Sequence, residues 1–196
     1  MVHSLNKMKI YEVRPDTNNV QWVMPRVLGE AILDVLSFDC VKRNDELNNI
    51  RWFIYDPKTP KKNFYTGING ALVFDQSVYD SELLTILEIA GEILPLNMET
   101  GEKLYLLNIL DCINVLDHDR SIRELYSDGT KGRVLQYAFH EDYLSESSLF
   151  KIPETSKVEI LTYSGVKGNS LDEFYTLYKE LGFTGLVFKE LYPLHA

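Results

Sequence analysis

The chain has 196 residues, of which 45% are apolar and 25% are charged. This composition is typical of a globular protein and argues against a disordered or collagenous chain. The 20 basic and 29 acidic side chains give a net charge of −9. A nucleic-acid-binding module normally presents a basic face, so the charge argues against that class.

Cysteine usage and the absence of targeting patterns indicate the compartment. Cys40 and Cys112 are too few for a disulfide scaffold; we expect two small buried side chains, with a redox switch as the alternative. The first residues lack the apolar run of a secretory signal. The longest apolar stretch, residues 104–116, is interrupted by polar residues, whereas a membrane span needs roughly 18 apolar residues. We therefore expect a cytoplasmic protein.

The first half of the chain predicts strands, one helix and a loop. Residues 9–14 alternate as a strand does. Pro25 is expected to open a helix, because apolar residues recur at helical spacing through residue 36. Residues 51–55 predict a strand, and residues 57–69, rich in lysine, asparagine and proline, predict an exposed loop.

A second helix is expected after residues 71–74, with its apolar face between Leu83 and Ala90 and a stop at Gly91. Further strands are expected at these ranges: 92–96, 103–110, 133–139, 149–152 and, more weakly, 158–163. The second of these is nearly all apolar, as in a strand covered on both faces.

The C-terminal segment predicts a helix followed by a strand. Ser170 and Glu173 have the spacing of a capping box, the apolar face of the helix runs from Leu171 to Leu181, and Gly182 ends it. Residues 185–189 predict the strand. We expect an α+β fold, a mixed and largely antiparallel sheet with a few amphipathic helices packed on it. Residues 1–196 form one domain, in which residues 1–91 and 92–196 could be two parts.

The negative charge is concentrated in the middle of the chain. Residues 75–146 hold 5 basic and 15 acidic side chains, whereas residues 1–74 are at net +2 and residues 147–196 at net −1. Charge of one sign in one region accelerates and selects association with an oppositely charged partner. The alternative is a solvated acidic surface that only aids solubility.

Asp117, His118 and Asp119 form the most site-like cluster, since two carboxylates and an imidazole can bind a metal or transfer protons. The calcium-loop pattern fails, because Ile122 stands at the glycine position. A polar loop after a strand is the plainer interpretation. Residues 165–170 only superficially resemble a phosphate loop, because the spacing of glycines and lysine is wrong.

Three apolar blocks resemble a family of bacterial immunity proteins, whose members protect the producing cell from a polymorphic toxin encoded next to them. The blocks are residues 106–117 with Ser121, residues 148–153 and residues 181–188, and the resemblance covers about residues 92–190. It implies an α+β fold, no catalytic residues, no cofactor or metal, and a cytoplasmic inhibitor that occludes a protein toxin.

Many such toxins are basic, because they act on nucleic acids, and an acidic surface would then steer the encounter. We therefore expect Asp117, Asp119, Glu141 and Asp142 to contribute to the toxin-binding face, with no nucleic-acid or membrane partner. A homo-oligomer remains open. Two alternatives remain: a hydrolase or metal-dependent enzyme that uses residues 117–119 with His140, and a small-ligand-binding domain.

Overall fold

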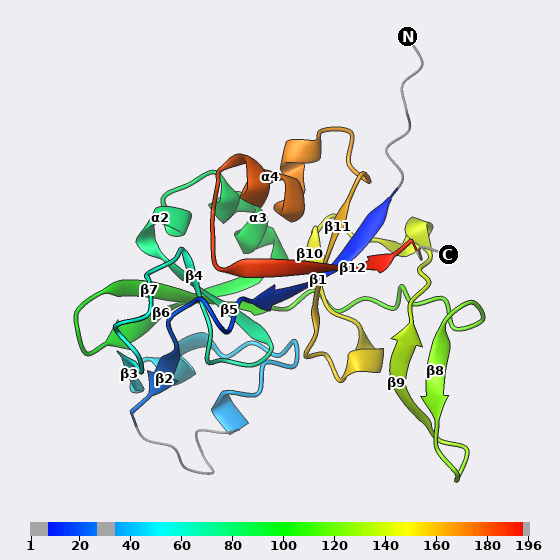
Figure 1. Cartoon of the computed structure of the whole chain (residues 1–196), viewed down its shortest axis with the longest axis horizontal. Helices are drawn as coiled ribbons and strands as arrows, with labels where there is room; N and C mark the ends of the chain where they lie inside the picture. Colours follow the sequence, from blue (N-terminus) through cyan, green and yellow to red (C-terminus); the bar gives the residue numbers. More distant parts are fainter. Residues whose placement is uncertain (1–7, 27–33, 194–196) are drawn as a thin grey trace.

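The computed structural model describes residues 8–26 and 34–193, which fold as two sheets, short helices and a separate hairpin (Figure 1). Most strand pairs are antiparallel and one, β3 with β6, is parallel. The predicted α+β class with a mixed, largely antiparallel sheet is confirmed. In the described ranges, no helix is long and apolar enough to cross a membrane.

The smaller sheet has four antiparallel strands in the order β10-β11-β1-β12. Its strands are β1 (Lys9–Pro15), β10 (Leu149–Phe150), β11 (Ile160–Ser164) and β12 (Leu186–Tyr192). The sequence predicted β1 from the alternation of residues 9–14, and it also predicted a strand at residues 185–189, which overlaps β12. β1 is central in the sheet, although it is first in the chain.

The larger sheet has six strands in the order β2-β3-β6-β7-β5-β4. They are β2 (Val23–Pro25), β3 (Arg51–Ile54), β4 (Phe64–Tyr65), β5 (Ala71–Asp75), β6 (Gly91–Met98) and β7 (Lys103–Ile109). A bridge between Trp22 and Thr66 joins its two edges, so the sheet curls toward closure. Gly67 permits this contact, because a Cβ there would lie 2.1 Å from the Val23 carbonyl oxygen.

Both sheets are covered on both faces. One core lies between the two sheets and buries α3 and α4 side chains, including Leu87 and Phe174. A second core covers the other face of the six-stranded sheet, and a third covers the other face of the four-stranded sheet. On β7, Leu106 enters one core and Leu107 the other, which is why this strand reads as continuously apolar.

The helices are short. Those that lie wholly within the described ranges are α2 (Gln76–Tyr79), α3 (Leu83–Ala90), α4 (Phe174–Glu180) and the 3-10 turns η1 (Asn44–Leu47), η2 (Glu141–Tyr143), η3 (Pro153–Thr155) and η4 (Ser170–Asp172). The expected helix at Leu83 with its stop at Gly91 is confirmed, and Gly182 has the left-handed φ of +68° expected after α4.

Three expectations from the sequence are wrong at particular residues. Pro25 ends strand β2 instead of opening a helix, and most of that expected helix lies outside the described residues. The expected loop 57–69 contains β4, whose Phe64 and Tyr65 are buried. The capping box is absent, because Asn169 caps η4 while Glu173 serves another loop.

A division of the chain at residue 91 does not separate the two sheets. β1 pairs with β11 and β12, and β3 pairs with β6. Each sheet therefore combines strands from both sides of that position.

Candidate functional site

A two-stranded hairpin, β8 (Ile122–Leu125) and β9 (Lys131–Gln136), extends from the body of the molecule (Figure 1). At its base the chain before β8 lies beside the chain after β9. Leu116 forms an antiparallel bridge with Phe139, and the Asp117 N–H donates to the Ala138 carbonyl at 2.9 Å. This pairing brings residues 117–119 close to residues 140–142.

Asp117 is part of the structure of this base. Its side chain is buried, and one carboxylate oxygen accepts the N–H groups of Asp119 and Arg120, both at 3.0 Å. The other oxygen binds the Arg120 guanidinium at 2.5 Å. The hydrogen bond from this guanidinium lowers the pKa of Asp117 to about 2. The negative charge of Asp117 is therefore paired with Arg120 within the protein.

Asp119, Glu141 and Asp142 are exposed, and none of their carboxylates forms an ion pair in the described ranges. We call these three residues the acidic corner. A cavity of about 370 Å³ opens beside it, lined among others by Arg120, His140 and Tyr143. The Tyr143 side chain is 64% exposed. The corner thus combines free negative charge with an exposed aromatic side chain.

The hairpin exposes an unusual amount of apolar surface. Its large exposed side chains are Ile122, Leu125, Tyr126 and Leu135, each more than half accessible and Leu125 70% exposed. Exposed apolar side chains that gather on one element indicate a binding surface. The sequence analysis missed β8, although Asp128-Gly129 between two extended runs is a hairpin-turn signal; Gly129 has a φ of +81° in that turn.

The metal-site alternative receives no geometric support from the described residues. His140 Nδ1 lies 3.8 Å from Asp117 Oδ2, but His118 Nε2 lies 3.1 Å from a Glu154 oxygen. The two histidines therefore have different carboxylate partners. No group of three or more His, Cys, Asp or Glu side chains within residues 8–26 and 34–193 is arranged to hold a metal ion.

Of the other acidic residues within residues 75–146, some form ion pairs and others lie away from the acidic corner. Glu99, Glu102 and Glu124 form ion pairs with basic side chains. Glu82 and Glu88 are exposed on the α2–α3 side of the molecule, away from the hairpin in Figure 1. The acidic residues thus do not share one face, and the acidic corner is one of several exposed acidic groups.

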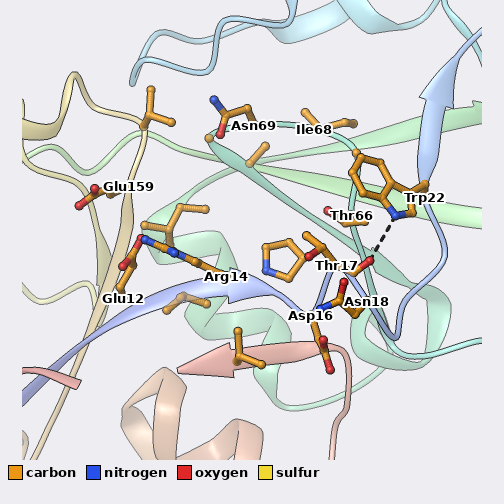
Figure 2. A pocket seen from close by; sticks show the side chains of 18 residues that line it. Glu12, Arg14, Asp16, Thr17, Asn18, Trp22, Thr66, Ile68, Asn69 and Glu159 are labelled. Carbon is orange, nitrogen blue, oxygen red and sulfur yellow. Dashed lines mark hydrogen bonds and ion pairs between the residues drawn. The ribbon is translucent and has the colours of Figure 1, made fainter. Parts of the chain in front are cut away.

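A cavity of about 830 Å³ is an open groove between β1, the turn before β5 and the start of β11 (Figure 2). Its buried Glu12 binds Arg14, and Glu159 accepts the Tyr137 hydroxyl at 2.7 Å. Trp22, 40% exposed, lies at one end. The charges that line the groove already have partners within the protein, so it gives the small-ligand alternative no specific support.

The loop that resembled a phosphate loop is occupied by the protein itself. Gly165, Val166 and Lys167 donate their N–H groups to the Glu173 carboxylate at 2.7–2.9 Å. Glu173 is fully buried. A side-chain anion thus takes the place that a phosphate would need, which agrees with the expectation that this loop binds no nucleotide.

Comparison with known proteins adds no relative: no protein-family model matches the sequence, and no curated protein matches it.

Proposed function

We propose that this chain is a non-catalytic binding protein that neutralises a basic protein toxin, as a cytoplasmic immunity protein does. One observation carries the proposal: three exposed carboxylates, with no ion pair to any described residue, lie at the base of a hairpin that exposes four large apolar side chains. An apolar centre beside charge is the composition of a protein-binding surface.

Charge selects the class of partner. The acidic corner is uncompensated, and the whole chain is at −9, so a basic surface would be attracted over a distance of about one Debye length, roughly 8 Å at physiological salt. A toxin that acts on nucleic acid carries such a surface. The resemblance of residues 92–190 to immunity proteins points to the same partner.

The acidic corner and the hairpin have separate roles in this proposal. The carboxylates of Asp119, Glu141 and Asp142 accelerate the encounter, whereas Leu125 and Tyr126 stabilise the complex once water has been excluded. Asp117 holds the base of the hairpin in shape through Arg120 and does not touch the partner. The sequence led us to expect Asp117 in the toxin-binding face; in this proposal it instead supports the base of the hairpin.

The test is co-expression with the C-terminal toxin domain encoded by the adjacent gene, followed by affinity measurement with the purified, catalytically inactive toxin. We expect the wild-type chain to restore growth. The triple variant Asp119→Lys, Glu141→Lys, Asp142→Lys should bind roughly a hundredfold more weakly at low salt, and its affinity should depend less on salt.

The matched control reverses three other exposed carboxylates that have no ion pair in the described ranges: Glu82, Glu88 and Glu180, on α3 and α4 or their ends. This variant has the same net charge as the first. Equal weakening of both variants would mean that only overall charge matters and would remove the corner from the interface. A wild-type chain that fails to bind and to rescue would refute the proposed function.

A further inference from the structure

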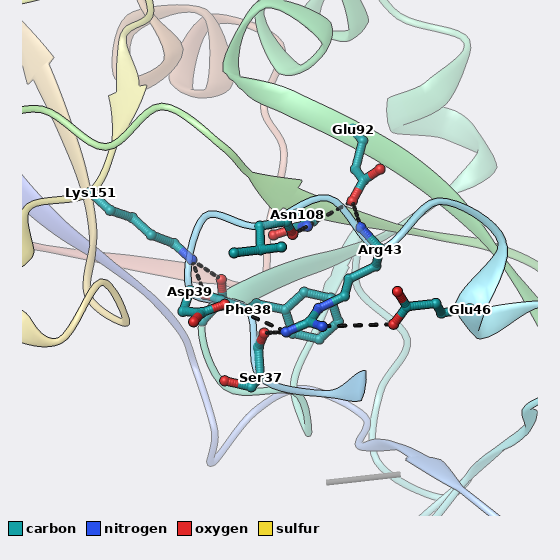
Figure 3. Close-up of polar contacts among 10 residues, drawn as sticks. Ser37, Phe38, Asp39, Arg43, Glu46, Glu92, Asn108 and Lys151 are labelled. Atoms are coloured by element: carbon teal, nitrogen blue, oxygen red, sulfur yellow. Dashed lines mark hydrogen bonds and ion pairs between the residues drawn. The ribbon is translucent and has the colours of Figure 1, made fainter. Parts of the chain in front are cut away.

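The loop at residues 37–46 lies against the end of the six-stranded sheet, where the buried side chains of Lys151 and Asn108 bind its backbone (Figure 3). Lys151 Nζ donates to the Phe38 carbonyl at 2.5 Å and to the Gly70 carbonyl at 2.6 Å. Asn108 Nδ2 donates to the Val41 carbonyl at 2.8 Å. The loop is thus fixed on both sides of Cys40.

The backbone of Lys151 also lies beside Cys112. This residue forms a parallel bridge with Lys151, and it follows Asn108 by four positions on the chain that leaves β7. Lys151 therefore links the two segments, through its side chain at Phe38 and through its backbone at Cys112, although 72 positions separate the two cysteines in the sequence. Both thiols are free and half-buried, so a small reagent can reach them.

A further observation supports contact between the thiols. Burial, with the neighbouring Cys112 thiol as the next cause, raises the pKa of Cys40 to about 12. Cys40 also has a φ of +70°, a left-handed conformation that is rare for a non-glycine residue and needs support from its surroundings.

We propose that Cys40 and Cys112 are a modification site, a dithiol that exchanges with a low-molecular-weight disulfide to form an intramolecular bond. One thiolate attacks the disulfide reagent and releases one thiol from it. The second cysteine then displaces the other half of the reagent. The Cys40 Sγ–Cys112 Sγ bond forms, both protons pass to the two released thiolates, and the reagent is reduced by two electrons.

The bond would fasten the 37–46 loop to the chain after β7, next to the Lys151 anchor. Because burial disfavours the Cys40 thiolate, exchange begins at Cys112; Cys40 then resolves the mixed disulfide as its proton passes to the leaving thiolate. The oxidised form would hold this loop covalently, and the reduced form would hold it only through hydrogen bonds.

The experiment equilibrates the full chain in glutathione buffers of graded composition and measures the oxidised fraction by intact mass and by peptide mapping. Repeating it in concentrated urea gives the value for the unfolded chain. We expect the effective concentration of the two thiols to be at least roughly tenfold higher in the native protein, because its structure holds them together. A native value equal to or below the unfolded value would overturn the proposal.

A displaced thiol provides the matched control. The variant Cys40→Ser, Val41→Cys keeps two thiols and nearly the same separation, but places one on a residue whose side chain is 50% exposed. We expect its native effective concentration to fall to about that of the unfolded chain. Equal effective concentrations in the variant and the wild type would show that the native loop does not hold Cys40 toward Cys112, and would also overturn the proposal.

Discussion

The charged side chains of the core and those of the hairpin differ in whether they have partners within the protein. In the core, each buried ionic group described above has its partners within the protein: Lys151 binds two carbonyl oxygens, and Glu173 binds three N–H groups. At the base and tip of the hairpin, carboxylates and large apolar side chains remain exposed. Charged groups with hydrogen-bond partners inside the protein stabilise the fold. The exposed carboxylates of the hairpin indicate where another protein binds.

The largest expected effect comes from removing an internal anion. Glu173→Ala removes a fully buried carboxylate and leaves the N–H groups of residues 165–167 without their acceptor, and should lower the free energy of unfolding by about 4 kcal/mol. Urea denaturation measures this. Glu173→Gln keeps one acceptor oxygen and should lose less; equal loss in both variants would show that hydrogen bonding at this site is unimportant.

We expect Lys151 to make the free energy of unfolding depend on pH in the alkaline range. Burial lowers the pKa of Lys151 from 10.5 to about 8, so between these values the unfolded chain binds more protons than the folded one. Stability from this group therefore rises as pH increases from about 8 to 10.5, by up to about 3 kcal/mol.

Lys151→Met should lack this rise. Burial raises the pKa of Tyr137 and Tyr163, which opposes it, but that contribution is common to both proteins. The difference between their urea midpoints across pH isolates the lysine, and parallel pH curves would contradict the assignment of a buried ammonium.

On the hairpin, truncation should affect binding and leave the fold intact. Leu125→Ala with Tyr126→Ala should weaken toxin binding at least tenfold, about 1.4 kcal/mol, while the free energy of unfolding changes by less than about 0.5 kcal/mol. Tyr55→Ala, which removes a 67% exposed aromatic side chain after β3, is the control. Equal weakening by the control would remove the hairpin from the interface.

The smallest effect is expected at Asp117, where the two regions meet. The pKa of Asp117 is lowered to about 2, so its contribution to stability is present above the ordinary carboxyl pKa near 4 and is lost as pH falls toward 2. Asp117→Asn should reduce stability at neutral pH and flatten this acid dependence in thermal melts. An unchanged acid profile would contradict the Arg120 pairing.

The sequence predicts those parts of the fold in which burial imposes a pattern. β1, β7, α3 and β12 have apolar residues at strand or helix spacing, because each packs against a core. β8 was missed because neither of its faces is buried, so no alternation marks it. β4 was missed because its two buried residues stand between polar ones.

The candidate site was predictable in residue type but not in arrangement. The sequence shows that residues 117, 119, 141 and 142 are acidic, but their proximity depends on the pairing of Leu116 with Phe139. The capping box failed for a similar reason: Glu173 has a tertiary use, in the loop 165–167, that a local spacing rule does not include.

Hydrogen exchange of the full chain, with and without the basic toxin domain, tests the central claim most directly. If the acidic corner and hairpin form the docking surface, amides within residues 119–143 gain protection in the complex and those of α2 and α3, residues 76–90, do not. Protection confined to α2 and α3, or a complex that leaves residues 119–143 unchanged, would contradict the account.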